Sequence, residues 1–272
     1  MMFCSFNHFC PFCIAKSVYE LDSKVRHELI QNYISGEDDY VSTLMSKTRD
    51  FLNQQKISSF CVSRKLLRTQ ESIFGCDAMI VFQINDIAKI CAFEAKYPKL
   101  NKKTNYGWDY LQKKHKKSHF SNQIERQSNW KNNLYIWEFF ILDYAFSQQG
   151  KVFDDLGSTC IWHKPTYNYD RQNINSTTLW KQQDLINLVT TPKRKIKSNN
   201  SQNLYKILLQ ILLDTTVNKQ RKVKNGSVTV RSNSGEEEEI IIPASLKNIE
   251  EQSNHFLKQS GIANFLFIQL NY

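Results

Sequence analysis

The feature that most constrains the fold lies in residues 71–96, where two apolar segments are separated by the dipeptide Asn85-Asp86. Asn and Asp tolerate the left-handed backbone of tight two-residue turns, so this pattern predicts a β-hairpin. With these two as the loop residues, residues that face each other across the hairpin have numbers that add up to 171. Asp77 then lies opposite Glu94, and the two-residue period of a strand places Lys96 on the same face as Glu94.

The two facing carboxylates indicate a metal site. In a purely structural hairpin, Asp77 and Glu94 would repel each other and would have to be desolvated together. A divalent cation between them removes both costs. The alternative is a ladder of surface ion pairs on a half-exposed hairpin. The flanking runs 78–82 and 90–93 are almost wholly apolar, which favours a sheet covered on both faces and disfavours that alternative.

The overall charge of the chain suggests an acidic partner. The chain has 272 residues, enough for one large domain or two small ones, and a formal net charge of +10. Nucleic acid is the simplest acidic partner, and an anionic membrane surface is the other candidate. No apolar run approaches the length of a membrane span, and the N-terminal sequence lacks the pattern of a secretory signal. The seven scattered cysteines do not resemble a disulfide framework, so a reducing, cytoplasmic location is expected.

Three cysteines and a histidine suggest a second metal. Cys10 and Cys13 have the spacing with which two thiolates hold one zinc, and Cys160 and His163 repeat that spacing downstream. Together they would form a structural Zn²⁺ site with three Cys ligands and one His ligand. The alternative is that Cys160 is a small buried apolar residue and that the N-terminal thiols are unpaired.

The apolar periodicity predicts two helices and a strand before the hairpin. Apolar residues recur at helical spacing over residues 15–34, and a second helix is expected after Gly36. Acidic residues at positions 37–39 lie in the first turn of this second helix, where carboxylates complement the helix dipole. Residues 57–67 predict a strand or a pair of strands.

A basic segment with interleaved aromatic residues follows the hairpin, over residues 99–117. Lysines neutralise phosphates and aromatic rings stack on bases, so the segment predicts a nucleic-acid contact surface. The alternative is a solvated loop whose aromatic residues anchor it to the core. The candidate nucleic-acid-binding residues are Lys102, Lys103, Lys113, Lys114, Lys116, Lys117 and His119.

Residues 118–130 predict a helix with Gln123 and Gln127 one turn apart on one face. These glutamines would contact a phosphate backbone or orient a water molecule, or they would be ordinary surface residues. Residues 134–146 are strongly apolar and are expected to be buried, as a helix or as a strand followed by a helix. Residues 159–163 predict a further strand.

The composition changes at residues 190–201, which are basic and polar and typical of a linker or a nucleic-acid-binding arm. We therefore divide the chain into a core at 1–192, a basic linker at 193–201 and a C-terminal α/β region at 202–272. The C-terminal region is expected to contain a helix at 204–213, short strands near 228–230 and 240–242, a helix through about residue 259 and a last strand at 265–270. It either completes the core sheet or forms a separate recognition unit.

The motif Gly75-Cys76-Asp77, sixteen intervening residues and Glu94-Ala95-Lys96 resembles the active-site motif of the PD-(D/E)XK nuclease superfamily, which has the restriction-endonuclease-like fold. In that family the motif spans consecutive antiparallel strands, an acid on the preceding helix often points into the site, and a glutamine-bearing helix often follows. Glu37 resembles the helical acid, and Gln123 with Gln127 resembles the glutamine-bearing helix. The resemblance covers roughly residues 37–127. Cys76 stands where the family often has proline, a position that is loosely kept.

The resemblance implies an α/β fold with a mixed β-sheet flanked by helices, and a Mg²⁺- or Mn²⁺-dependent nuclease that hydrolyses phosphodiester bonds in DNA. Asp77, Glu94 and the backbone carbonyl of Ala95 would hold the cation through oxygen atoms, with Glu37 as a further ligand. Lys96 would orient or activate the attacking water and offset phosphate charge.

Several points remain alternatives. Glu71 is a further candidate for a ligand or a supporting acid. An RNA-cleaving nuclease is one alternative function, and a non-catalytic nucleic-acid-binding module of the same fold is another. The intact set of two acids and a lysine disfavours the second, because a binding module has no need of that charge cluster. Cleavage of both DNA strands would suggest a homodimer.

Overall fold

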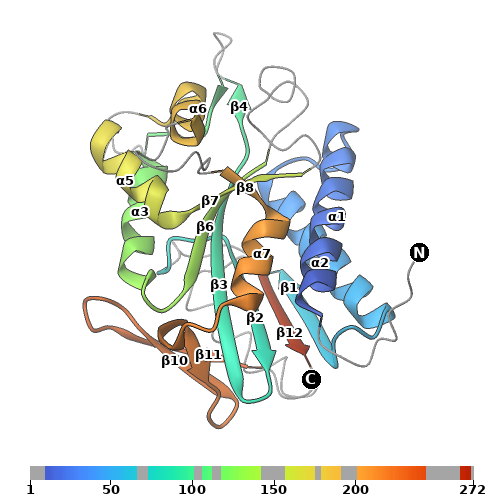
Figure 1. Cartoon of the computed structure of the whole chain (residues 1–272). Helices are drawn as coiled ribbons and strands as arrows, with labels where there is room; N and C mark the ends of the chain where they lie inside the picture. The colour runs from blue at the N-terminus through green and yellow to red at the C-terminus, as the bar shows by residue number, and fades with distance from the viewer. Residues whose placement is uncertain are drawn as a thin grey trace.

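One mixed β-sheet with helices on both faces forms the architecture of the protein (Figure 1). The computed structural model describes residues 10–65, 73–100, 106–111, 118–141, 157–174, 179–190, 201–242 and 264–270. The strand order is β1-β12-β2-β3-β6-β7-β8, and β9 also pairs with β3. The pairs β12–β2 and β3–β6 are parallel and the other pairs are antiparallel. The strands of this sheet are β1 (Phe60–Lys65), β2 (Ala78–Ile84), β3 (Ile87–Lys96), β6 (Tyr135–Phe140), β7 (Thr159–Trp162), β8 (Ser201–Asn203), β9 (Gln220–Lys222) and β12 (Asn264–Leu270). The expectation of an α/β chain with a mixed sheet flanked by helices is confirmed.

The central hairpin has the register that the sequence predicts. Its partners run from Ala78 opposite Phe93 to Ile84 opposite Ile87, so every pair adds up to 171. Asn85, in the turn, has a φ of 55°, the left-handed conformation that Asn adopts more readily than most residues. Both strands are buried along most of their length, because β12 and β6 pair with their outer edges and apolar clusters cover both faces.

Three helices cover one face of the sheet (Figure 1). They are α1 (Pro11–Ile30), α2 (Glu37–Gln54) and α7 (Leu204–Leu213). Helix α1 packs against both α2 and α7. Buried apolar side chains at helical spacing, such as those of Leu204, Ile207, Leu208 and Ile211 on α7, meet the sheet and form the largest apolar cluster. The buried Lys89 of β3 donates hydrogen bonds of 2.9 and 2.8 Å to the last carbonyls of α7, and this satisfies acceptors that a helix end leaves open.

Two smaller apolar clusters lie on the opposite face. One is formed with the hairpin of β10 (Ser227–Arg231) and β11 (Glu237–Ile241) and includes Trp130 at the end of α3. The other is formed by α6 (Gln182–Thr190), the first half of α3 (His119–Trp130) and Trp108. Helix α5 (His163–Asn173) packs against α3. Short elements complete the described chain: β4 (Lys99–Leu100), β5 (Tyr106–Gly107) and a 3₁₀ turn at Val217–Lys219.

Most expected elements coincide with observed ones, and the observed elements that were not predicted are α5, α6 and the short strands β4, β5, β8 and β9. The apolar segment after residue 134 is a strand, β6, as far as the structure describes it. Residues 163–173 form α5, a helix that the sequence pattern did not predict. The expected helix near residue 259 and most of the basic linker at 193–201 lie outside the described residues. The C-terminal region contributes β12, which lies between β1 and β2. Within the described ranges, no helix combines the length and the apolar character needed to span a bilayer.

Candidate metal centre

A group of polar side chains interrupts the apolar face of β3 and β6. On β3, Ala88, Ile90 and Ala92 belong to one apolar cluster, and the next residues on that face are Glu94 and Lys96. On β6, Glu138 lies between apolar residues on the same face and pairs in register with Glu94. These charged side chains are therefore held in a gap between the two smaller apolar clusters.

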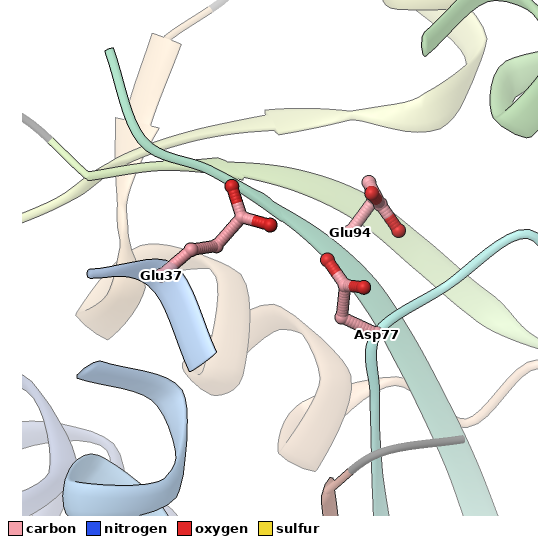
Figure 2. Close-up of side chains that lie close together, drawn as sticks. All are labelled: Glu37, Asp77 and Glu94. Carbon is pink, nitrogen blue, oxygen red and sulfur yellow. The ribbon is translucent and has the colours of Figure 1, made fainter. Parts of the chain in front are cut away.

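Three carboxylates converge in this gap, and Figure 2 shows their side chains directed toward one another. Glu37 comes from the first turn of α2, Asp77 from the loop that enters β2, and Glu94 from β3. One oxygen atom from each lies within 4.8 Å of the others. Among the residues that the structure describes, no other group of three or more His, Cys, Asp or Glu residues meets this criterion.

Hydrogen bonds from backbone amides fix the carboxylates of Asp77 and Glu37. The amide of Ala95 donates to Asp77 Oδ2 at 3.1 Å, and the amide of Tyr97 donates to Glu37 Oε2 at 2.9 Å. The amide of Asp77 donates to the carbonyl of Phe93 at 3.0 Å, which continues the hairpin ladder by one bond. Asp77 and Glu37 are thus held by backbone amides at the end of β3, the strand that carries Glu94, and of the residue that follows it.

Lys96 is the cation of the cluster. Its Nζ forms a hydrogen-bonded ion pair with Glu94 Oε1 and lies over the ring of Phe120, 5.0 Å from the ring centroid. Burial alone would lower the pKa of Lys96, but the charges of Glu94, Glu37 and Asp77 outweigh it and raise that pKa. Lys96 therefore stays charged and offsets part of the negative charge.

Glu94 has the properties expected of a cation ligand. Its side chain is 1 % exposed, and Oε2 is buried without a hydrogen-bond partner. Burial raises the pKa of Glu94 well above its usual range, and the charges of Asp77 and Glu37 raise it further against the opposing effect of Lys96. An unpaired buried acceptor is costly, and a cation would remove that cost. Three carboxylates are the oxygen donors that Mg²⁺ and Mn²⁺ prefer, so the residues fit such an ion.

A second polar network supports the site from α3 and α5. Gln127 is fully buried, and its Nε2 donates to the carbonyl of Gly75 at 2.8 Å and to Glu138 Oε2 at 3.2 Å. His163 Nδ1 lies 2.8 Å from Gln127 Oε1 and 3.3 Å from Glu138 Oε1. The network thus ties α3 and α5 to the loop that carries Asp77.

The position of Gly75 explains how this loop comes so close to α3. Gly75 has a φ of +66°, and a Cβ there would meet the carbonyl oxygen of Gln123 at 2.4 Å. Only glycine meets both requirements without strain. Gln123 itself is 8 % exposed, and its Oε1 is buried without a hydrogen-bond partner. Of the two glutamines, Gln127 makes the contacts that orient the acidic loop.

The zinc site expected from Cys10, Cys13, Cys160 and His163 is not assembled, because their ligand atoms form no cluster of three. Cys160 belongs to the apolar cluster under α1 and α7, whereas His163 takes part in the network on the opposite face of the sheet. The sulfur of Cys10 instead accepts a hydrogen bond from the amide of Cys13, as the N-cap of α1. The alternative reading of Cys160 as a small buried apolar residue is the one that the structure favours.

The candidate nucleic-acid-binding segment is described only in part. Lys102, Lys103, Lys113, Lys114, Lys116 and Lys117 lie outside the described residues, as does Glu71. Trp108 is buried against Phe140 and anchors the segment to the core. Tyr110 is 46 % exposed, and its ring stacks on that of His119 with centroids 4.6 Å apart.

Reasoning from the sequence missed Glu138, and it assigned His163 to a zinc site instead of this network. Glu138 is fully buried beside Glu94, and His163 is buried in the network rather than bound to zinc. Glu138 left one signal, because it is the only charged residue in the apolar run 134–141. A lone acid in a buried strand indicates a specific partner.

Comparisons of the chain with models of known protein families, with curated proteins and with solved structures gave no match.

Proposed function

We propose that the protein is a metal-dependent nuclease of restriction-endonuclease-like fold that hydrolyses phosphodiester bonds in DNA. The observation that carries this proposal is the convergence of Glu37, Asp77 and Glu94, with Lys96 bound to Glu94. The sequence motif alone resembles the PD-(D/E)XK nucleases. The convergence supports the resemblance, because the acid from the preceding helix reaches the two acids of the hairpin.

The proposed roles follow from what each side chain contacts. Asp77, Glu94 and Glu37 would hold Mg²⁺ or Mn²⁺, and the carbonyl of Ala95 is a further candidate ligand. The bound ion would polarise the scissile phosphate and lower the pKa of a water molecule. Lys96, charged and fixed by Glu94, would orient the attacking water and stabilise the negative charge that develops on the phosphate.

The supporting network would keep these ligands in place during the reaction. Gln127 holds the carbonyl of Gly75, two residues before Asp77, and Glu138 and His163 hold Gln127. Because all three are buried, the loop that carries Asp77 has little freedom to move relative to β3. The water oxygen would form the new bond to phosphorus as the bond to the leaving sugar oxygen breaks.

Incubation of the purified protein with plasmid DNA and Mg²⁺, Mn²⁺ or EDTA tests the proposal. We expect cleavage with the metals and none with EDTA. Asp77→Asn, Glu94→Gln and Lys96→Ala should each reduce the cleavage rate by about 10²-fold or more, because each removes a ligand or a charge at the reacting phosphate. Asp86→Asn is the matched control. It removes a carboxylate from the turn of the same hairpin, where Asp86 is exposed and pairs with Lys222 at 3.5 Å.

The outcomes separate the alternative functions. Cleavage of single-stranded or structured RNA, with DNA left intact, would favour the RNA-cleaving alternative. Metal-independent binding without cleavage of any nucleic acid would favour the non-catalytic module. The enzyme proposal fails if no divalent metal supports cleavage and if folded Lys96→Ala protein behaves like the wild type.

A further inference from the structure

A cavity of about 510 Å³ lies where the first turn of α5 meets the turn between α3 and β6. We call it the α5 cavity. Three lysines line it, Lys131, Lys164 and Lys219, and the described lining residues include no carboxylate. Its volume is in the range of small-molecule sites, roughly 300–1,000 Å³. The α5 cavity is therefore large enough for a ligand and positively charged.

The positive charge of the α5 cavity is not neutralised by ion pairs. Within the described ranges, none of the three lysines forms an ion pair; Lys131 Nζ lies 5.2 Å from the ring centroid of Tyr167, and Lys219 Nζ lies 4.7 Å from that of Tyr135. Asp214 acts on Lys219 electrostatically, but its carboxylate is already held by Tyr135 and by Thr216. The N-cap of α5 has no side-chain hydrogen bond, so the positive end of the helix dipole adds to the field.

The remaining walls of the α5 cavity suit a planar polar group better than a bare anion. The lining residues also include two aromatic residues, Trp162 and Tyr167, and two apolar residues, Leu134 and Ile136. Asn132 and Asn168 supply amides that both donate and accept hydrogen bonds. Inorganic phosphate has no flat apolar surface to match these groups, whereas a nucleobase combines a flat face with polar edges.

His163 provides a buried polar atom without a partner at this site. It lines the α5 cavity, it is 3 % exposed, and its Nε2 has no hydrogen-bond partner. Both contacts of Nδ1 are to oxygen atoms, on Gln127 and Glu138, so Nδ1 carries the proton and the orientation of the ring is fixed. His163 also links the α5 cavity to the candidate metal centre. It contacts Glu138, and the backbone of Glu138 on β6 is paired in register with that of Glu94 on β3.

We propose that the α5 cavity binds one nucleotide of an unpaired nucleic-acid strand. The lysines and the first turn of α5 hold the phosphate, and the base lies against the aromatic side chains within reach of the two asparagines. The choice of a nucleic-acid strand rests on the proposed nuclease function; the choice of a nucleotide rests on the α5 cavity itself. The α5 cavity would thus hold the strand at a fixed distance from the metal centre.

Binding measured in EDTA tests this site without cleavage. Fluorescence anisotropy would give the Kd of a labelled single-stranded DNA of about six nucleotides, a length typical of single-strand sites. The double variant Lys131→Ala/Lys164→Ala should raise the Kd about tenfold and reduce the salt dependence of binding. Lys181→Ala/Lys206→Ala is the matched control, because it removes the same charge from exposed lysines outside the α5 cavity. We expect the control to change the Kd less than about twofold.

Two further measurements separate the phosphate from the base. An oligonucleotide without bases should bind more weakly to the wild type, and Tyr167→Leu should remove that difference. Deoxyadenosine monophosphate should compete with the oligonucleotide at concentrations where inorganic phosphate does not. Equal effects of the two lysine double variants, or equal competition by inorganic phosphate, would overturn the proposal. If Lys131→Ala/Lys164→Ala protein does not fold, Lys164→Gln alone, at an exposed position, takes its place.

The same experiments distinguish the two proposals. Oligonucleotide binding that depends on the α5 cavity, in a protein that cuts nothing, would retain this site and reject the nuclease. Metal-dependent cleavage, with no difference in Kd between the two lysine double variants, would retain the nuclease and reject this site.

Discussion

Glu94 is the residue on which the candidate metal centre depends most directly. It is in contact with Lys96, one of its oxygens lies within 4.8 Å of an oxygen of Asp77 and of Glu37, and one of its oxygens is buried without a partner. Burial raises its pKa, and the neighbouring carboxylates raise it further. The folded protein therefore binds a proton at Glu94 more tightly than the unfolded chain does, and a metal ion at this site would compete with that proton.

The sign of the resulting pH dependence follows from the raised pKa. In metal-free protein, the stability contributed by the proton on Glu94 is complete below the unfolded pKa of Glu and is lost as the pH rises through the higher folded pKa. Mg²⁺ should bind more tightly as the pH rises, because the competing proton on Glu94 is then held by a smaller fraction of the molecules. We therefore expect the increase in Tm caused by Mg²⁺ to grow as the pH rises. Each kcal/mol of stabilisation by bound Mg²⁺ should raise the Tm by about 2–4 °C. Thermal unfolding across a pH series with Mg²⁺ and with EDTA measures it.

Glu94→Gln is the informative variant for this prediction. A glutamine resembles the uncharged acid but cannot form the ion pair with the buried Lys96, so the metal-free variant should be no more stable than the wild type at neutral pH. Its Tm should respond little to Mg²⁺. An unchanged response to Mg²⁺ in this variant would show that Glu94 is not a ligand.

The sequence predicted Asp77, Glu94, Lys96 and Gln127 as site residues, but not the contacts of Glu138 and His163 that support them. The hairpin register alone brings Asp77, Glu94 and Lys96 onto one face. This register could be predicted because a two-residue turn is determined by local sequence. Glu138 and His163 join them only through the parallel pairing of β3 with β6 and the packing of α5 against α3. Such contacts between distant segments leave little trace in local pattern.

Among the elements, the loop before β2 is held most tightly. Gly75 has a positive φ, its carbonyl accepts a hydrogen bond from Gln127, and its Cα lies against the backbone of Gln123. Gly75→Ala would combine backbone strain with a 2.4 Å contact to a helix carbonyl. We expect a loss of at least about 1–3 kcal/mol in the free energy of unfolding, measured by chemical denaturation.

The matched control for Gly75→Ala is Gly107→Ala. A Cβ at Gly107 would meet its nearest atom, the carbonyl oxygen of Trp180, at an ordinary 3.6 Å. The stability of this variant should change by less than about 0.5 kcal/mol. Because Gly75 precedes Asp77 by two residues, Gly75→Ala should also weaken Mg²⁺ binding, whereas Gly107→Ala should not. Equal effects of the two substitutions would contradict the close approach of the loop to α3.

The helices show why some elements are predictable and others are not. The start of α3 was predicted, and its N-cap Ser118 accepts a hydrogen bond from the amide of Ser121 at 2.9 Å. Helix α5 was missed because its buried residues are His163, Thr166 and Asp170 rather than a stripe of apolar side chains. A helix whose buried face is polar gives no apolar periodicity, although that face is what serves the site.

For the whole molecule, the position of β12 matters most. Its apolar sequence predicts a strand, but only the tertiary structure places it between β1 and β2 and parallel to β2. At its start, the amide of Asn264 donates to the carbonyl of Asp77 at 3.1 Å. A strand from the C-terminal region thus supports both the centre of the sheet and the loop that carries a proposed ligand.

This arrangement predicts that β12 and the metal centre unfold together. Phe267 is fully buried in β12, so Phe267→Ala should cost about 3–5 kcal/mol of stability, whereas Gln269→Ala, at a half-buried position, should cost about 1 kcal/mol or less. Hydrogen-exchange measurements would show whether Mg²⁺ slows the exchange of the backbone amides of β12 as well as those of β2 and β3. We expect one common increase in protection across the three strands, because opening β12 removes the hydrogen bond to Asp77. Protection of β2 and β3 without β12 would mean that the C-terminal strand opens as an independent unit.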